Sequence, residues 1–244
     1  MEKIKLQKYF TDCGIMSRRA AEGEILNGKV LVNGEAAFLG MRIDPDVDTV
    51  EYNGKILKPM GDGRICVMLN KPTGFVTTLS DEKGRRTVAE LTADVGARVY
   101  PIGRLDMNSD GLLLLTNDGE LANRLTHPRH EIPKIYRVTV GGEVTPDTLS
   151  ALSSPMVIDG YKIQPVKTSV VSYNKEKKQT LLSMELYEGR NRQIRKMCEL
   201  VGLRVSRLSR IAIGELVLGD LPVGKWRRLT VDELEYLRGN KNRI

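Results

Sequence analysis

The stretch PIGRLDMNSDGLLLLTNDG, residues 101–119, places three aspartates around a run of four leucines in a chain whose net charge is +7. Asp106 and Asp110 precede the leucines, and Asp118 follows them. An apolar run of this length between clusters of Asn, Asp and Gly predicts a buried strand with a turn at each end. Catalytic groups concentrate in loops that a rigid scaffold holds, so the three carboxylates are the first candidates for chemistry.

Two kinds of metal site would use these aspartates. Residues 106–111, DMNSDG, match the first six positions of a calcium-binding EF-hand loop, but the twelfth position is Asn117 instead of Glu. Pro and Gly also stand where the entering helix of an EF-hand belongs. A two-metal nuclease stays open as an alternative because the chain is basic, although the leucine strand separates Asp118 from the other two aspartates.

The neighbours of the aspartates favour a different interpretation. Asp110 and Gly111 fit a turn before the strand, and residues 117–119 fit a second turn that leads into a helix. Asp106, two residues after Arg104, is then a lone carboxylate in a tight loop between two buried strands. Such a group suits covalent or acid–base chemistry on a polyanion without a metal.

The composition is that of a globular protein without a membrane segment. The chain has 244 residues, 41% hydrophobic and 28% charged, which is enough for one or two domains with a real core. No apolar run approaches the roughly 18 residues of a spanning helix, and the first ten residues lack the apolar centre of a signal peptide. We therefore expect a cytoplasmic protein. The distant Cys13, Cys66 and Cys198 predict buried free thiols.

Residues 1–60 predict a small unit that folds on itself. Two short helices come first, the second with Ser17 as its N-cap, and a strand follows. Asn-Gly pairs at 33–34 and 53–54 predict tight hairpin turns. Residues 57–64, LKPMGDGR, hold one Pro and two Gly among polar residues and predict a linker. The expected domains are therefore 1–60 and 64–244.

The second domain mixes strand and helix patterns without regular alternation. We expect an α+β domain built on a largely antiparallel mixed sheet flanked by helices, rather than a doubly wound fold. The strand-like segments are 64–70, 97–103, 111–117, 134–140 and 179–187, and the helix-like segments are 119–127, 145–153, 191–202 and 230–239.

The positive charge is concentrated in this second domain. Residues 1–60 hold nine Lys or Arg and nine Asp or Glu, so the rest of the chain carries the whole +7. Residues 190–210 hold seven basic side chains against one acid, Glu199, which fits either a solvated face or, in a basic chain, a site for a polyanion such as nucleic acid. Arg18 and Arg19 fall at the first turn of the second helix, where free backbone N–H groups also favour phosphate.

Residues 103–128, GRLDMNSDGLLLLTNDGELANRLTHP, closely resemble the catalytic motif of bacterial ribosomal RNA pseudouridine synthases of the RsuA/RluB/RluF group. Three further segments follow that family's order: LNKPTGFVTT at 69–78, KIYRVTV at 134–140 and EGRNRQIRKMCELVG at 188–202. Residues 17–35, SRRAAEGEILNGKVLVNGE, are similar to the S4 RNA-binding module that these enzymes carry at the N-terminus. The resemblance covers nearly the whole chain and implies an S4-like αα-β module followed by a pseudouridine synthase domain.

The resemblance implies a role for each residue that matches the family's motifs. Asp106 corresponds to the catalytic aspartate, Tyr136 to the active-site tyrosine and Arg195 to the basic partner that keeps the carboxylate ionised and aimed. Tyr136 would stack on the extruded uracil. The residues expected to bind RNA are Arg18, Arg19, Lys71, Arg104, Arg190, Arg192 and Lys196.

The implied reaction breaks the bond between N1 of uracil and C1′ of ribose and joins C5 to C1′, without redox change, so we expect no cofactor and no metal. The carboxylate would remove a proton at the sugar, attack C1′ or add to C6 of the base, and the sequence leaves the three routes open. Expected partners are ribosomal RNA or ribosome assembly intermediates, with no membrane, and a monomer is the default. The N-terminal similarity, CELVG at 198–202 and GKWRRLT at 224–230 favour a large-subunit target over a small-subunit one, and a non-catalytic RNA-binding factor is the rival interpretation.

Overall fold

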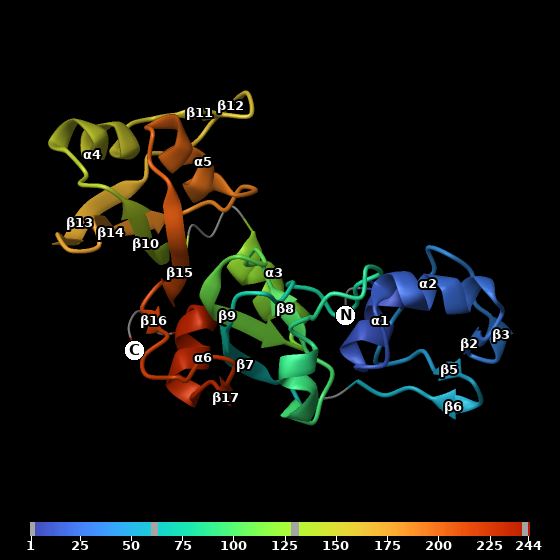
Figure 1. Ribbon diagram of the computed structural model, residues 1–244. Helices are drawn as coiled ribbons and strands as arrows, with labels where there is room; N and C mark the ends of the chain where they lie inside the picture. The colour runs from blue at the N-terminus through green and yellow to red at the C-terminus, as the bar shows by residue number, and fades with distance from the viewer. Residues whose placement is uncertain (1–2, 60–62, 128–131, 241–243) are drawn as a thin grey trace.

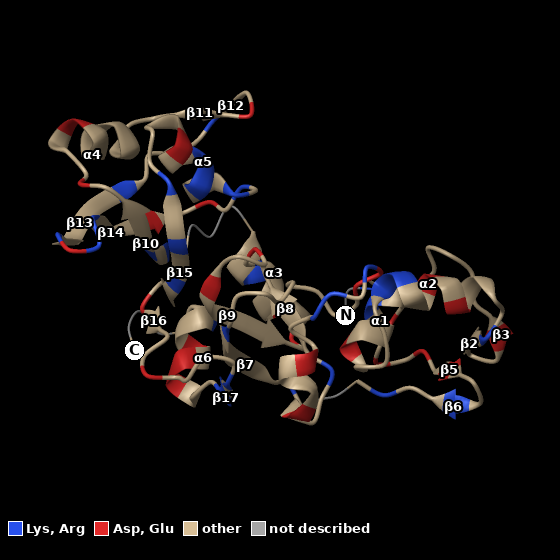
Figure 2. Cartoon of the chain, viewed as in Figure 1, with Lys and Arg blue, Asp and Glu red and all other residues tan. Residues whose placement is uncertain are grey.

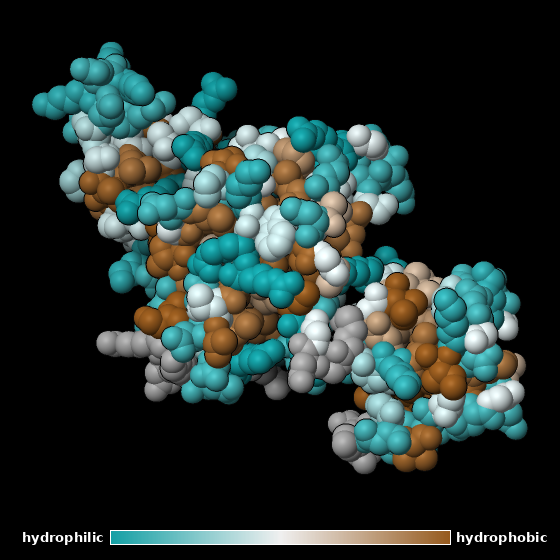
Figure 3. Space-filling model, turned by 90° about the horizontal axis from the view of Figure 1, so that it is seen from below, coloured by the Kyte–Doolittle hydropathy of each residue, from teal (hydrophilic) through white to brown (hydrophobic). Residues whose placement is uncertain are grey.

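The computed structural model describes residues 3–59, 63–127, 132–240 and 244, and residues up to 57 form a lobe of their own (Figures 1 and 3). One hydrophobic cluster, drawn from residues 6–57, forms the core of this lobe. Its strands pair in the order β3-β2-β5-β6 and, separately, β1-β4. The elements are β1 (Ile4–Lys5), α1 (Leu6–Asp12), α2 (Arg18–Leu26), β2 (Val30–Val32), β3 (Glu35–Ala36), β4 (Arg42–Ile43), β5 (Val50–Tyr52) and β6 (Lys55–Ile56).

Local sequence signals account for the lobe's turns and caps. The Ser17 side chain accepts a hydrogen bond from the backbone N–H of Ala20 and so caps α2 as predicted. Both Asn-Gly pairs adopt positive φ at each residue, the conformation that tight hairpin turns require. The boundary at residue 60 stays a prediction, because the proposed linker includes residues 60–62, which lie outside the described residues.

The rest of the chain is built on one nine-stranded sheet, in which β9 and β15 are parallel and the other pairs are antiparallel (Figure 1). The α+β prediction is confirmed. Its main path runs β13-β14-β10-β15-β9-β7-β17, with β8 and β16 at the side. The strands are β7 (Cys66–Lys71), β8 (Tyr100–Ile102), β9 (Asp110–Thr116), β10 (Lys134–Gly141), β13 (Lys167–Asn174), β14 (Gln179–Leu186), β15 (Val205–Ile213), β16 (Leu216–Val217) and β17 (Trp226–Arg228).

Helices cover the two halves of this sheet separately. The half formed by β10, β13, β14 and β15 shares a core with α4 (Pro146–Ser153) and α5 (Gln193–Leu200). The half formed by β7 and β9 packs one face on α3 (Gly119–Thr126) and α6 (Val231–Arg238) and the other on a short 3-10 helix, Glu90–Val95. A small hairpin of β11 (Val157–Ile158) and β12 (Tyr161–Lys162) lies beside α5. No helix in the described part of the chain is both long and apolar enough to cross a membrane.

The two halves join at a short parallel seam between β9 and β15. Asp110 lies opposite Ser209, and Gly111 lies opposite Arg210. Asp110 is buried and accepts hydrogen bonds from Nε of Arg207, at 3.0 Å, and from the Ser209 hydroxyl. The prediction that Asp110 and Gly111 form a turn is wrong, because both pair within the sheet as the first two residues of β9.

Gly111 is required at the seam for two reasons. Its φ of +105° is a conformation that side chains disfavour, and a Cβ there would overlap the carbonyl oxygen of Arg210 and lie 2.9 Å from the Arg210 nitrogen. The Arg210 side chain then crosses the seam and donates from Nε to the Leu112 carbonyl at 2.8 Å. The close approach of the two backbones is therefore built into the sequence at one position.

We expect Gly111→Ala to destabilise the protein by about 3 kcal/mol, since it combines backbone strain with a steric overlap that the sheet cannot relieve. Gly84→Ala is the matched control, because Gly84 also has positive φ but a Cβ added there would meet no atom within 4 Å. That control should lose only ~1 kcal/mol. Urea unfolding of both variants measures the difference, and equal losses would contradict a special role for the seam.

Candidate active site

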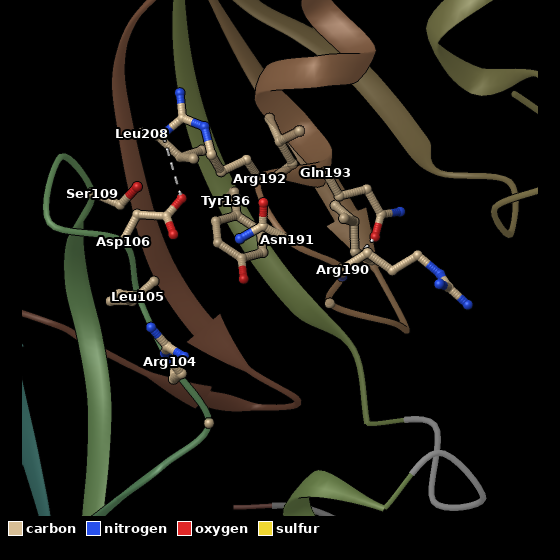
Figure 4. A pocket seen from close by; sticks show the side chains of 14 residues that line it. Arg104, Leu105, Asp106, Ser109, Tyr136, Arg190, Asn191, Arg192, Gln193 and Leu208 are labelled. Carbon is tan, nitrogen blue, oxygen red and sulfur yellow. Dashed lines mark hydrogen bonds and ion pairs between the residues drawn. The ribbon is translucent and has the colours of Figure 1, made fainter. Parts of the chain in front are cut away.

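A pocket of about 410 Å³ opens beside the seam, where the loop after β8, strand β10 and the start of α5 meet (Figure 4). Asp106, Tyr136 and Arg192 all line it. The Asp106 side chain is 37% exposed, so the carboxylate is accessible to a ligand. The structure thus brings together two of the three predicted catalytic residues in one cavity, with an arginine from α5's N-terminal end beside them.

The loop that carries Asp106 is held by its backbone carbonyls. In this Asp106 loop, residues 105–109, the Thr77 hydroxyl donates to the Leu105 carbonyl at 2.6 Å, and the Gly74 N–H donates to the Met107 carbonyl at 2.7 Å. The Ser109 N–H donates to the Asp106 carbonyl at 3.0 Å and closes a turn. Because several fixed donors hold the backbone, the position of the carboxylate does not depend on contacts of the side chain itself.

Lys71 is the central donor to this loop. Its ammonium, on β7, donates to the carbonyls of Pro72 at 3.0 Å, Asp106 at 3.1 Å and Ser109 at 2.9 Å, which uses its three N–H groups. Burial lowers the pKa of Lys71 to about 8, and the carboxylates of Asp110 and Asp106 oppose that shift. The prediction that Lys71 binds RNA is wrong, because the residue is completely buried and its three N–H groups are used within the protein.

Arg195 also holds the Asp106 loop. Its Nη2 donates to the Asn108 carbonyl at 2.7 Å and its Nη1 to the Val205 carbonyl at 3.4 Å. In the described part of the chain, the ion pair of Asp106 is with Arg192, whose Nη1 lies 4.0 Å from Oδ2, and not with Arg195 (Figure 4). Arg195 therefore holds the backbone of the loop, while Arg192 supplies the positive charge nearest the carboxylate.

Tyr136 forms the wall of the pocket that faces Asp106. It lies on β10 between Met184 of β14 and Arg210 of β15 and packs partly against the cores of both sheet halves. Figure 4 shows its ring beside the Asp106 carboxylate and near Asn191. A half-buried ring in this position offers an aromatic face to a planar base.

The other residues of the catalytic part that are expected to bind RNA differ in the contacts that their side chains already make within the protein. Arg104 is exposed and lines the pocket. Arg190 points away from Asp106 in Figure 4 and lies over the ring of Tyr161, with its Cζ 3.1 Å from the ring centroid. Lys196 forms an ion pair with Asp159 in the turn between β11 and β12.

The N-terminal lobe holds two of the residues that are expected to bind RNA. Arg18 and Arg19 are exposed at the first turn of α2, as the sequence predicts. Figure 2 shows Lys and Arg positions at this end of α2 and on α5 and β15.

The three aspartates of the opening stretch have separate environments. Asp118 caps α3 by accepting from the backbone N–H groups of Glu120 and Leu121, and it pairs with Arg238 at 3.1 Å. Asp110 is engaged at the seam, at the other end of β9. Within the described ranges no group of three His, Cys, Asp or Glu side chains is placed to hold a metal ion.

Two features of the site were not found by reading the sequence, one that supports the Asp106 loop and one that lines the pocket. Thr77 both donates to the Leu105 carbonyl and accepts from the Leu105 N–H at 3.2 Å, and it lies within the segment 69–78 that the family resemblance marks. Ser109 lines the pocket with a buried hydroxyl that has no hydrogen-bond partner among the described residues. A serine before Asp and Gly reads as an ordinary turn residue, so the sequence offers no signal for it.

Comparison with known proteins gives the same family from sequence and from structure. A family model described as RNA pseudouridylate synthase matches residues 65–200. The ribosomal large subunit pseudouridine synthase B of Bacillus subtilis (strain 168) is 40% identical over 235 residues, which cover 96% of this chain and 95% of that protein. The dual-specificity RNA pseudouridine synthase RluF of Escherichia coli (strain K12) is 37% identical over 234 residues, 95% of this chain and 77% of that protein.

A solved structure extends the similarity to the fold. A crystal structure of a pseudouridylate synthase superposes with a TM-score of 0.69 at 28% identity, and the match covers 96% of this chain and 99% of the other. The matched family region includes the Asp106 loop, Tyr136 and the start of α5, which line the pocket, and also β7, which carries Lys71. The chain belongs to the family of RNA pseudouridylate synthases and is an isomerase.

Proposed function

We propose that this enzyme converts a specific uridine of ribosomal RNA to pseudouridine, with Asp106 as the catalytic carboxylate. The observation that carries the proposal is the accessible Asp106 carboxylate, which faces the Tyr136 ring in one pocket, on a loop whose backbone is fixed by Lys71 and Arg195. Fixed donors around a reacting group reduce the reorganisation that the reaction needs. The pocket is large enough to accept an extruded base.

The chemistry follows from these groups. The uridine leaves the RNA stack, because its reactive atoms are inaccessible inside a helix, and its base lies against Tyr136. Asp106 assists cleavage between N1 and C1′, by proton removal or attack at the sugar or by addition to C6, and the base rotates before C5 joins C1′. Arg192 places a positive charge 4.0 Å from the carboxylate, where it can orient the Asp106 side chain. The atoms of uridine are all retained, so the reaction itself requires no redox partner.

We infer a large-subunit target from the relative in Bacillus subtilis, whose name gives that subunit. The N-terminal lobe acts as an S4-like RNA-binding module, with Arg18 and Arg19 as phosphate contacts at the start of α2. Since ribosomal RNA is a cytoplasmic substrate in bacteria, the enzyme works in the cytoplasm, as a monomer on RNA or on assembly intermediates.

Incubating unmodified ribosomal RNA with the protein in EDTA should form pseudouridine, which nucleoside mass spectrometry detects. Asp106→Asn should abolish the product while RNA affinity stays within about twofold, because the amide keeps the size of the carboxylate and loses its charge. Product from the variant would remove Asp106 from the role. Binding without product from the wild type, on free RNA and on assembly particles, would support the non-catalytic factor.

Turnover should fall as the pH rises through about 8, because deprotonation of Lys71 removes one N–H from the three carbonyls that it holds. In Lys71→Arg the guanidinium does not titrate, so that variant should lack this decline. Single-turnover rates from pH 6.5 to 9 would measure the difference.

The stability effect of Lys71 has the opposite sign. Its folded pKa, about 8, lies below the unfolded value, so between them the unfolded state binds more protons and the free energy of unfolding rises with pH.

The pH dependence of turnover decides whether Lys71 supports catalysis. Identical pH–rate profiles for the wild type and Lys71→Arg would contradict the role of the Lys71 ammonium in holding the Asp106 loop.

Replacing Arg18 and Arg19 together with Gln should weaken binding to structured ribosomal RNA and reduce the slope of log affinity against log salt by about 2, one for each phosphate contact. Lys55→Gln with Lys58→Gln is the matched control, because these exposed lysines lie on β6 and two residues after it, away from α2. Salt titrations of binding measure both pairs. An unchanged slope for the arginine pair, or an equal change for the lysine pair, would count against an RNA-binding face on α2.

A further inference from the structure

A second hollow shares Arg192 with the active pocket. Its volume is about 410 Å³, and its lining includes three arginines, Arg192, Arg195 and Arg204, and one acid, Glu199. We propose that this arginine hollow binds a backbone phosphate of the RNA strand, at a nucleotide next to the uridine in the active pocket. The inference rests on the proposed RNA substrate and names a binding site that the catalytic chemistry does not require.

The charges of the hollow are only partly balanced within the protein, where Arg192 pairs with Asp106 of the active pocket. The Arg204 side chain is exposed and has no acidic partner within 4.0 Å among the described residues. Glu199 likewise forms no ion pair within the described ranges, so the lining carries an excess of two positive charges. Burial, with the nearby charge of Arg192, lowers the pKa of Arg195. A bound anion would relieve this repulsion between like charges.

One nitrogen of the Arg195 side chain is already removed from water. Nε of Arg195 is buried and has no hydrogen-bond partner in the described part of the chain. The same guanidinium has its two terminal nitrogens engaged, with the carbonyls of Asn108 and Val205. Arg195 therefore contributes a fixed positive charge to the hollow rather than a flexible surface side chain.

Arg192 connects the hollow to the active pocket because it lines both. It is the residue before α5 and has φ 53° and ψ 30°, a left-handed conformation that is uncommon for a residue with a side chain. Its side chain makes no capping hydrogen bond to the helix. Such strain is retained at functional sites when the surroundings impose it, and here it places one arginine between two cavities.

These features favour a phosphodiester over other anions. Guanidinium groups present planar forks that match phosphate oxygens, and Arg192 and Arg204 offer such forks in the hollow, where Arg195 adds a fixed charge. Arg192 would contact both a base in the active pocket and a phosphate in the hollow. Such a shared contact is expected when the base and the phosphate are neighbouring groups of one RNA strand. Arg195 then also joins the phosphate to the Asp106 loop through the Asn108 carbonyl.

The test uses the full-length protein and a ribosomal RNA fragment that contains the modified uridine. Arg204→Gln should weaken binding about tenfold at moderate salt and reduce the salt slope by about 1, as loss of one phosphate contact does. Glu199→Gln should tighten binding severalfold, because it removes the one negative charge from the lining. Lys177→Gln, in the exposed turn between β13 and β14, is the control for loss of one surface charge and should leave affinity unchanged.

A scan of neutral methylphosphonate linkages locates the phosphate. One linkage near the target uridine should weaken wild-type binding about tenfold and have no further effect on Arg204→Gln, because both changes remove the same contact. Additive losses at every linkage, or weaker binding by Glu199→Gln, would overturn the proposal. All arms measure binding, so failure of the catalytic proposal appears separately, as absence of pseudouridine from the wild type.

Discussion

The pairing of Gly111 with Arg210 is the contact on which the rest of the catalytic part depends. It joins two half-sheets with separate cores through two parallel residue pairs, and only a residue without a side chain allows the backbones to approach so closely. The Asp106 loop ends at this seam, and Tyr136 lies opposite Arg210 across the next strand pair. A carboxylate from one half and a ring from the other therefore meet because the seam fixes the distance between them.

Electrostatics at the site work through the backbone as much as through ion pairs. A buried ammonium with three carbonyl acceptors costs less than an unpaired buried charge, since each donor is satisfied, and it ties β7 to both ends of the turn at residues 106–109. Arg195 ties α5 to the middle of the same turn. The turn is thus connected to both half-sheets, so movement of one half relative to the other would shift the carboxylate.

Local patterns in the sequence predicted much of this architecture, and long-range pairing is where they failed. The cap at Ser17 and the Asn-Gly turns depend on neighbouring residues, and the structure has them as predicted. The central strand β15 was missed, because its alternating serines and arginines at 205–213 read as a basic surface run. Its inward positions, Leu208 and Arg210, are buried only because β9 and β10 flank it.

At the site, too, motifs of neighbouring residues predict correctly, and features that depend on long-range contacts are missed. A resemblance to a family's motifs identified Asp106 and Tyr136 as neighbours, and the structure places both in one pocket. Whether a lysine or arginine binds solvent-side phosphate or a buried carbonyl depends on tertiary contacts that no spacing rule contains. Lys71 and Arg195 were therefore assigned to direct contacts with substrate or carboxylate, whereas both hold backbone.

The way the Asp106 loop is anchored has a consequence for how such an enzyme diverges. Its supports bind main-chain oxygens, which every amino acid possesses, while the side chains of Met107 and Asn108 are exposed at the tip. Substitutions at these two positions alter the surface offered to RNA without removing any support of the catalytic carboxylate. Descendants of one gene can thus acquire new target sites by mutation beside the reacting group, at little cost to the reaction.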